Sequence, residues 1–136
     1  MQKAIDELVR RRAEHVCEYC HFPQPPFHIE HIIARKHGGI TIERNLALSC
    51  ARCNFHKGPN LSGIDPETGA TVLLFHPRRD EWKEHFQWRR AVLVGLTPSG
   101  RATIKVLEMN HSARIAAREQ LILEGLLQVE PDLDFR

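Results

Sequence analysis

The chain has 136 residues, of which 42% are hydrophobic and 26% are charged, and its formal net charge is +2. This length fits a single domain, residues 1–136, with a modest core. The longest apolar runs have four residues, whereas a membrane span needs roughly 20, and the N-terminus lacks the apolar core of a signal peptide. We therefore expect a cytoplasmic protein without a membrane segment.

Apolar residues recur at helical spacing near the N-terminus, which predicts an amphipathic helix over residues 3–15. Arg10, Arg11 and Arg12 spread around this helix. Short runs of charge are common on solvated helix faces, so we favour that interpretation over contact with DNA.

Residues 27–57 predict a strand, a loop, a second strand and a helix, in that order. The first strand alternates polar and apolar residues until Ile32 and Ile33 break the pattern. The helix has a stop signal at Gly58-Pro59. The expected elements are a strand over 27–31, a loop over 34–44 around Gly38-Gly39, a strand over 46–49 and a helix over 50–57.

The sequence beyond residue 57 gives weaker predictions and contains no chemical motif that we recognise. Its expected elements are a linker over 58–69, a strand over 71–76, an extended segment over 86–94, a turn over 97–100, and helices over 102–109 and 112–124. Trp82, Phe86 and Trp88 are expected in its core. The whole pattern predicts an α+β protein in which residues 61–136 form a small C-terminal α/β extension of unassigned role.

The four cysteines form two Cys-x-x-Cys pairs, Cys17/Cys20 and Cys50/Cys53, with 29 residues between them. Without a secretion signal, this pattern indicates a metal site rather than disulfides, ordinary buried thiols or a redox pair. Four thiolates complete the closed tetrahedron of structural zinc, which leaves no position for water or substrate. We therefore expect zinc to hold the scaffold and to take no part in the chemistry.

The ordered set "CEYC", "HIEHIIARKHGG", "NLALSCARCN" and "HKG", within residues 15–60, resembles the HNH endonuclease family. Each piece is weak alone, but the ordered set is specific. The resemblance implies a ββα-metal core with zinc knuckles, in which two strands and a helix hold a divalent ion beside a DNA phosphodiester. The wider sequence resembles free-standing bacterial members of the family.

The resemblance also implies roles for individual residues. His31 matches the general base, and Glu30 matches the acidic metal ligand beside it. Asn54 matches the ligand supplied by the helix, and Asn45 matches the residue that braces the loop carrying the base. A neutral imidazole can take a proton from water, and Mg²⁺ or Mn²⁺ on oxygen ligands can stabilise charge on the phosphate and on the leaving oxygen.

Two positions depart from the common pattern of the family: Glu30 stands where Asp is common, and Asn54 stands where the motif's third letter is His. His28 or His56 is therefore an alternative ligand of the divalent ion. Taken singly, these residues also have ordinary structural interpretations, such as an ion pair of Glu30 with a nearby base. Three basic side chains are the expected phosphate contacts: Arg35, Lys36 and Lys57.

The sequence thus predicts a metal-dependent HNH endonuclease that hydrolyses DNA, acting as a monomer or a homodimer. A polyanion is expected to meet residues 1–60, which carry nine Lys/Arg against six Asp/Glu. The rival interpretation is a non-catalytic, zinc-stabilised module for nucleic-acid binding or interaction, which would need none of Glu30, His31 and Asn54. RNA is left open as a substrate.

Overall fold

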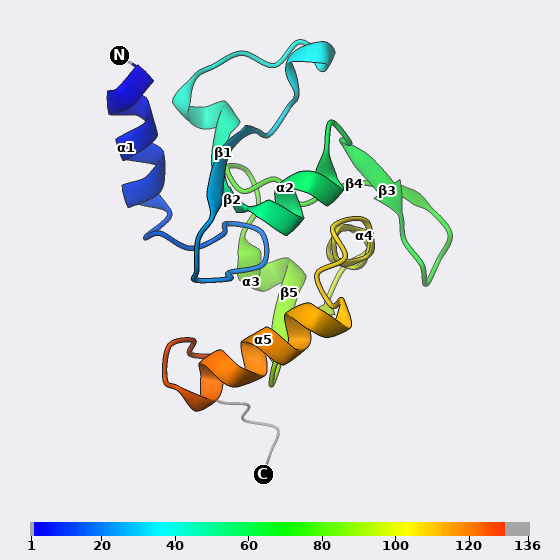
Figure 1. Cartoon of the computed structure of the whole chain (residues 1–136). Coiled ribbons are helices and arrows are strands. Elements are labelled where there is room, and N and C mark those ends of the chain that lie inside the picture. The colour runs from blue at the N-terminus through cyan, green and yellow to red at the C-terminus, as the bar shows by residue number, and fades with distance from the viewer. Residues whose placement is uncertain (1, 130–136) are drawn as a thin grey trace.

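The computed structural model describes residues 2–129, which form helices and small two-stranded antiparallel sheets (Figure 1). This mixture confirms the predicted α+β class. The elements are α1 (Gln2–Arg12), β1 (Phe27–His31), β2 (Leu46–Cys50), α2 (Ala51–Lys57), β3 (Ser62–Ile64), β4 (Thr71–Leu73), α3 (Trp82–His85), β5 (Phe86–Arg89), β6 (Val92–Gly95), α4 (Pro98–Val106) and α5 (Ser112–Leu123), with 3₁₀ turns at Arg35–His37 and Glu43–Asn45. No helix within residues 2–129 is long and apolar enough to cross a membrane.

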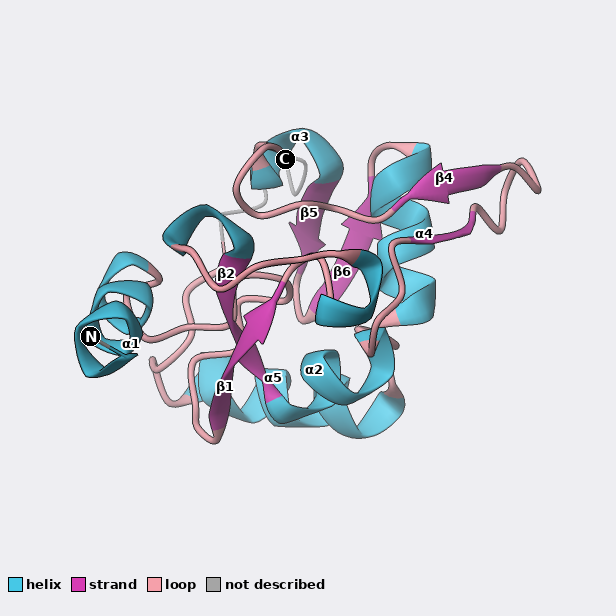
Figure 2. Ribbon diagram, turned by 90° about the horizontal axis from the view of Figure 1, so that it is seen from above, coloured by secondary structure: helices cyan, strands magenta, loops and turns pink. Residues whose placement is uncertain are grey.

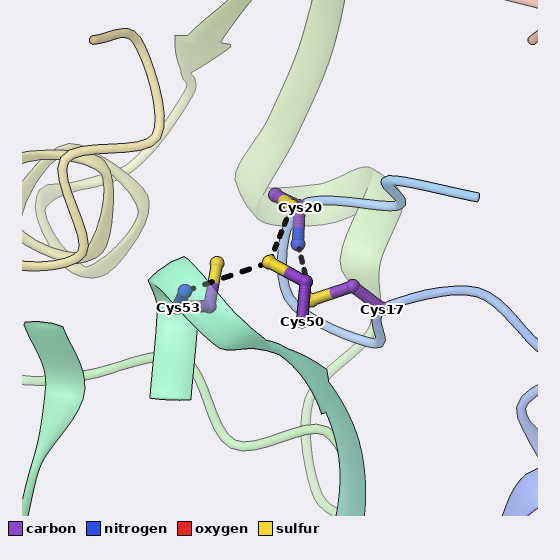
Figure 3. A group of neighbouring side chains, drawn as sticks. All are labelled: Cys17, Cys20, Cys50 and Cys53. Atoms are coloured by element: carbon purple, nitrogen blue, oxygen red, sulfur yellow. Dashed lines mark hydrogen bonds between the residues drawn. The ribbon is translucent and has the colours of Figure 1, made fainter. Parts of the chain in front are cut away.

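The predicted strand–loop–strand–helix unit is present. β1 and β2 pair antiparallel, with Glu30 opposite Ala47 and His31 opposite Leu46. Every residue of β2 is buried, because this strand lies in the interior of the unit and not at its surface. α2 follows β2 without a loop, and this junction brings the second cysteine pair back to the first (Figure 3).

The N-terminal helix covers the outer side of this unit, at one end of the molecule (Figure 2). Val9 and Ala13 pack against Leu46 and Leu48. The helix ends at Arg12, earlier than predicted, because the next residues leave helical geometry and Glu14 and His15 adopt positive φ. Arg12 does more than sit on a solvated face, since its guanidinium donates to the carbonyls of Glu43 and Leu46 at 3.1 and 2.7 Å.

Two predictions for the C-terminal extension are wrong. Residues 58–69 are not a linker: β3 lies within them and pairs with β4, around a turn in which Asp65 accepts hydrogen bonds from Glu67 N and Thr68 Oγ1. Residues 97–100 are not a free turn. Thr97 caps α4 by accepting a bond from Gly100 N, and Pro98 occupies the first turn, both of which are helix-start signals.

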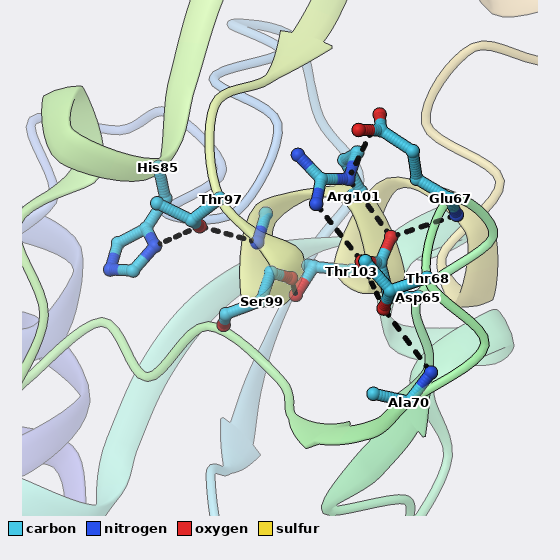
Figure 4. Close-up of polar contacts among 10 residues, drawn as sticks. Asp65, Glu67, Thr68, Ala70, His85, Thr97, Ser99, Arg101 and Thr103 are labelled. Atoms are coloured by element: carbon cyan, nitrogen blue, oxygen red, sulfur yellow. Dashed lines mark hydrogen bonds and ion pairs between the residues drawn. The ribbon is translucent and has the colours of Figure 1, made fainter.

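The remaining predictions for the extension hold with changed bounds. The strand expected over 71–76 is limited to β4, and the extended segment over 86–94 is the β5–β6 hairpin, which turns at Arg90 with positive φ. α4 begins earlier than the helix expected over 102–109, whereas α5 closely matches the helix expected over 112–124. Arg101 joins α4 to the β3–β4 turn through two 2.9 Å hydrogen bonds to the buried carboxylate of Asp65 (Figure 4).

One continuous buried cluster extends from the cysteines into the C-terminal extension. Phe86 and Trp88 are buried in it, and Trp82 packs against it, as the sequence analysis expected. Trp82 also donates its indole N–H to the carbonyl of Tyr19 at 2.8 Å, inside the first cysteine pair. The extension is therefore part of the packing that supports the cysteines.

Candidate zinc centre and active site

The four cysteine side chains converge at one buried point. Their sulfurs all lie within 4.8 Å of one another, and each residue is at most 2% exposed. With zinc–sulfur bonds of about 2.3 Å and tetrahedral angles, two sulfurs of one site lie about 3.8 Å apart. The Sγ atoms of Cys20 and Cys50 are 3.7 Å apart, so the cluster fits a structural zinc ion held by Cys17, Cys20, Cys50 and Cys53.

Each cysteine pair is shaped by its own backbone. The amide of Cys20 points at the sulfur of Cys17, and the amide of Cys53 points at the sulfur of Cys50, both at 3.5 Å. The second contact is also the N-cap of α2, so the zinc pair and the helix start are one structure. Hydrogen bonds with the other cysteines lower the pKa of Cys50 and raise that of Cys53, and burial raises the pKa of Cys17. Cys50 is therefore favoured as the thiolate, and a metal would have to displace protons from its neighbours.

Glu30 is buried on β1 and held by two partners. The hydroxyl of Tyr19 donates to Oε1, and the ammonium of Lys57 lies 3.6 Å from Oε2. Burial raises the pKa of Glu30, while Lys57 and Tyr19 act in the opposite direction. The Lys57 ammonium also donates to the carbonyl of Ile32 at 2.9 Å.

Lys57 is only 2% exposed, so its ammonium is not at the surface where a phosphate would meet it. The predicted phosphate contact is therefore wrong for this residue. Lys57 instead ties α2 to the end of β1 and supplies the counter-charge of Glu30.

His31 is the last residue of β1 and is half-buried. Its Nε2 lies 2.8 Å from the hydroxyl of Thr41, which also accepts a bond from Arg35 at 3.1 Å. Burial lowers the pKa of His31, and the charge of Arg35 lowers it further. The imidazole is thus oriented by the loop that follows β1 and is favoured in its neutral form.

Asn45 closes that loop from inside. Its Oδ1 accepts from the amide of Ile33 at 2.9 Å, and its Nδ2 donates to the carbonyls of Ile33 and Ile40 at 3.0 and 2.9 Å. One side chain just before β2 therefore fastens the start of the loop to its middle.

A scan against protein-family models matches residues 17–60 to the HNH endonucleases. The chain carries an HNH domain. The match begins at the first cysteine and ends just beyond α2, so it covers less than half of the chain and leaves the extension outside. Searches of the curated proteins and of the solved structures gave no significant match.

The other expected site residues of the HNH domain lie on β1, on α2 and in the loop that follows β1. Asn54 is half-buried on α2, directly after Cys53, and His28 is exposed on β1, two residues before Glu30 and so on the same face. His56 lies 3.4 Å from the carboxylate of Glu108 in the extension, a partner that the sequence did not indicate. Arg35 and Lys36 are exposed beside the loop.

Within residues 2–129, the cysteine cluster is the grouping of three or more His, Cys, Asp or Glu side chains close enough to hold an ion. The pair Glu30 and Asn54 contains fewer than three side chains of these types. A divalent ion bound there is therefore a proposal. Sequence reasoning missed Tyr19 and Thr41, the partners of Glu30 and His31. Tyr19 stood inside the quoted "CEYC", but nothing local indicates that its hydroxyl reaches β1.

The loop of the HNH domain depends on Gly39 in a way that can be tested. A Cβ at Gly39 would lie 1.7 Å from the carbonyl oxygen of Ile33, which is backbone and cannot rotate away. We expect Gly39→Ala to reduce the free energy of unfolding by about 3 kcal/mol, measured by urea denaturation of the zinc-loaded protein.

Gly38→Ala is the matched control for this prediction. A Cβ at Gly38 meets nothing within 4 Å, but the residue has φ of 89°, so we expect a cost of only about 1 kcal/mol. Equal losses in the two variants would contradict the close approach of Gly39 to Ile33.

Proposed function

We propose that the protein is a metal-dependent endonuclease that hydrolyses DNA phosphodiesters, leaving 5′-phosphate and 3′-hydroxyl ends. The observation that carries the proposal is the setting of His31: a half-buried, oriented imidazole at the end of β1, next to a buried carboxylate, in an HNH domain. A module that only binds would need neither this orientation nor the neighbouring Glu30.

His31 acts as the general base in this proposal. With Nε2 donating its hydrogen to Thr41 Oγ1, Nδ1 is the ring nitrogen left to accept the proton of the attacking water. Asn45 keeps the loop and hence the ring in place, since it fastens Ile33 and Ile40 on either side of the turn. Arg35, exposed and 3.1 Å from Thr41, lies where it can also approach a phosphate.

Glu30 and Asn54 are the proposed ligands of one Mg²⁺ or Mn²⁺, with His28 or His56 as the alternative to Asn54. Lys57 favours the ionised form of Glu30, as a metal ligand requires. A carboxylate oxygen that accepts one hydrogen bond keeps a second lone pair, so the contact with Tyr19 does not block coordination. When bound, the ion would stabilise negative charge on the phosphate and on the leaving 3′-oxygen.

Incubation of supercoiled plasmid with the zinc-loaded protein tests the proposal. We expect conversion to nicked or linear DNA when Mg²⁺ or Mn²⁺ is added, and none when free divalent ions are withheld. A parallel gel-shift assay separates the rival function. Retarded but uncut plasmid at every divalent-ion concentration would overturn the nuclease and leave a zinc-stabilised binding module. An RNA substrate in the same assay distinguishes the two nucleic acids.

The pH dependence of cleavage follows from the environment of His31. The rate should rise with pH as the imidazole loses its proton, with a midpoint below the ordinary value of about 6.5, because burial and Arg35 lower this pKa. Arg35→Met removes one of these two causes, so we expect its midpoint to move to higher pH. Single-turnover rates between pH 5 and 8 measure both midpoints.

Lys36→Met is the control for the pH shift. It removes the same charge from the adjacent exposed residue, and Lys36 is not among the groups that lower the pKa of His31. We expect weaker DNA binding but the wild-type midpoint. A midpoint that stays fixed in Arg35→Met would show that His31 is not the group that titrates.

A further inference from the structure

The four cysteine ligands leave the zinc centre with an uncompensated negative charge. Four thiolates at −1 and a zinc ion at +2 leave a net charge of −2, enclosed where each cysteine is at most 2% exposed. A buried charge is costly unless a counter-charge or hydrogen bonds compensate it. The two amide–sulfur contacts described above supply only part of this compensation.

Helix α5 of the C-terminal extension carries two arginines to this point. Arg114 and Arg118 are four residues apart and so share one face of the helix. The guanidinium of Arg114 lies 3.9 Å from the sulfur of Cys50 and stacks on the ring of Phe22, 3.7 Å from its centre. Phe22 lies two residues after Cys20, so Arg114 contacts both of the segments that carry the cysteine pairs.

Arg118 is fully buried in the layer behind. It donates to the carbonyl of Ala91 at 2.7 Å and to Asn110 at 3.1 Å, while its third nitrogen, NH1, is buried without a hydrogen-bond partner among the described residues. Burial lowers the pKa of Arg118, the neighbouring charge of Arg114 lowers it further, and the charges of Cys20, Cys53 and Cys50 act in the opposite direction. Arg118 thus adds a buried positive charge one helical turn after Arg114, on the face of α5 that reaches Cys50.

We propose that Arg114 and Arg118 are the counter-charge of the zinc–thiolate centre, so that the extension serves to retain zinc in the HNH domain. This gives residues 61–136 a function that is independent of any contact with DNA. Arg114 makes the direct contact with sulfur, and Arg118 balances the charge from the buried side.

The test uses the full-length, zinc-loaded protein and the rate at which a chromogenic chelator removes zinc. Arg114→Met and Arg114→Gln remove the charge and should release zinc about 10-fold faster than wild type. Arg114→Lys keeps the charge and should stay close to wild type. Arg89→Met removes the same charge from an exposed residue of the same extension, and should release zinc at the wild-type rate.

A second readout reports on the sulfurs themselves. In protein loaded with Co²⁺ instead of zinc, loss of a neighbouring positive charge should move the sulfur-to-cobalt charge-transfer band to lower energy in Arg114→Met and not in Arg89→Met. Neutral Arg114 variants with wild-type zinc release and an unmoved cobalt band would overturn the proposal, as would equal effects of Arg89→Met. Neither readout involves DNA cleavage, so the nuclease proposal and this one can fail separately.

Discussion

Replacing Cys50 with serine is expected to abolish stable folding of the chain, including the extension beyond the HNH domain. Structural zinc on thiolates contributes on the order of 10–16 kcal/mol, whereas a domain of this size has a net stability of about 5–15 kcal/mol. Cys50 is also the N-cap of α2 and a member of the buried cluster that continues into the extension. Far-ultraviolet circular dichroism and zinc content of the purified variant measure the effect.

Ser49→Ala is the control for this prediction. Ser49 is the neighbouring residue on β2 and is fully buried, and among residues 2–129 its hydroxyl donates to the carbonyl of Cys50 at 3.1 Å. We expect this variant to bind zinc and to lose about 1 kcal/mol. A Cys50→Ser protein that unfolds at the same urea concentration as wild type would contradict a structural zinc at this cluster.

His31→Ala is expected to reduce the rate of DNA cleavage by about 10²–10⁴, the usual contribution of a positioned general base. The fold should survive, because the ring is half-buried and makes one described hydrogen bond, to Thr41. DNA affinity should change little, since the neutral imidazole contributes no charge to phosphate binding. Single-turnover cleavage and a gel shift measure the two quantities separately.

His37→Ala is the matched control for His31→Ala. His37 is an exposed histidine in the 3₁₀ turn of the same loop and has no role in the proposed catalysis. We expect wild-type cleavage from this variant. A similar loss of rate in both variants would indicate that the loop tolerates no substitution, and would remove the assignment of the base to His31.

The parts of the fold predicted correctly are those specified by local spacing. Two cysteine pairs define the zinc cluster, and alternation defines β1. A helix follows Cys50 because its sulfur accepts from the amide of Cys53 and so caps the first turn. The start of α4 is also encoded locally, because Thr97 followed by Pro98 is a helix-start pattern, and the turn predicted over 97–100 is wrong for that reason.

Other features depend on tertiary packing, which a short segment of sequence does not specify. Lys57 follows Asn54 by three residues, which suggested a shared exposed side, but α2 turns its ammonium inward onto Glu30 and Ile32. Likewise, Arg114 is an ordinary helical arginine in the sequence, and only the fold brings it to Cys50. Tertiary contacts determine which charged residue compensates a buried charge, so sequence spacing does not identify that residue.

Chemical rescue of His31→Ala by imidazole is the most direct test of the central claim, that a side chain held at the end of β1 takes a proton from water during DNA cleavage. The zinc-loaded variant is mixed with plasmid and Mg²⁺, and the cleavage rate is followed as imidazole is added at several pH values. We expect the rate to rise in proportion to neutral imidazole, while wild type does not respond. Cleavage by His31→Ala at the wild-type rate without imidazole would contradict the account.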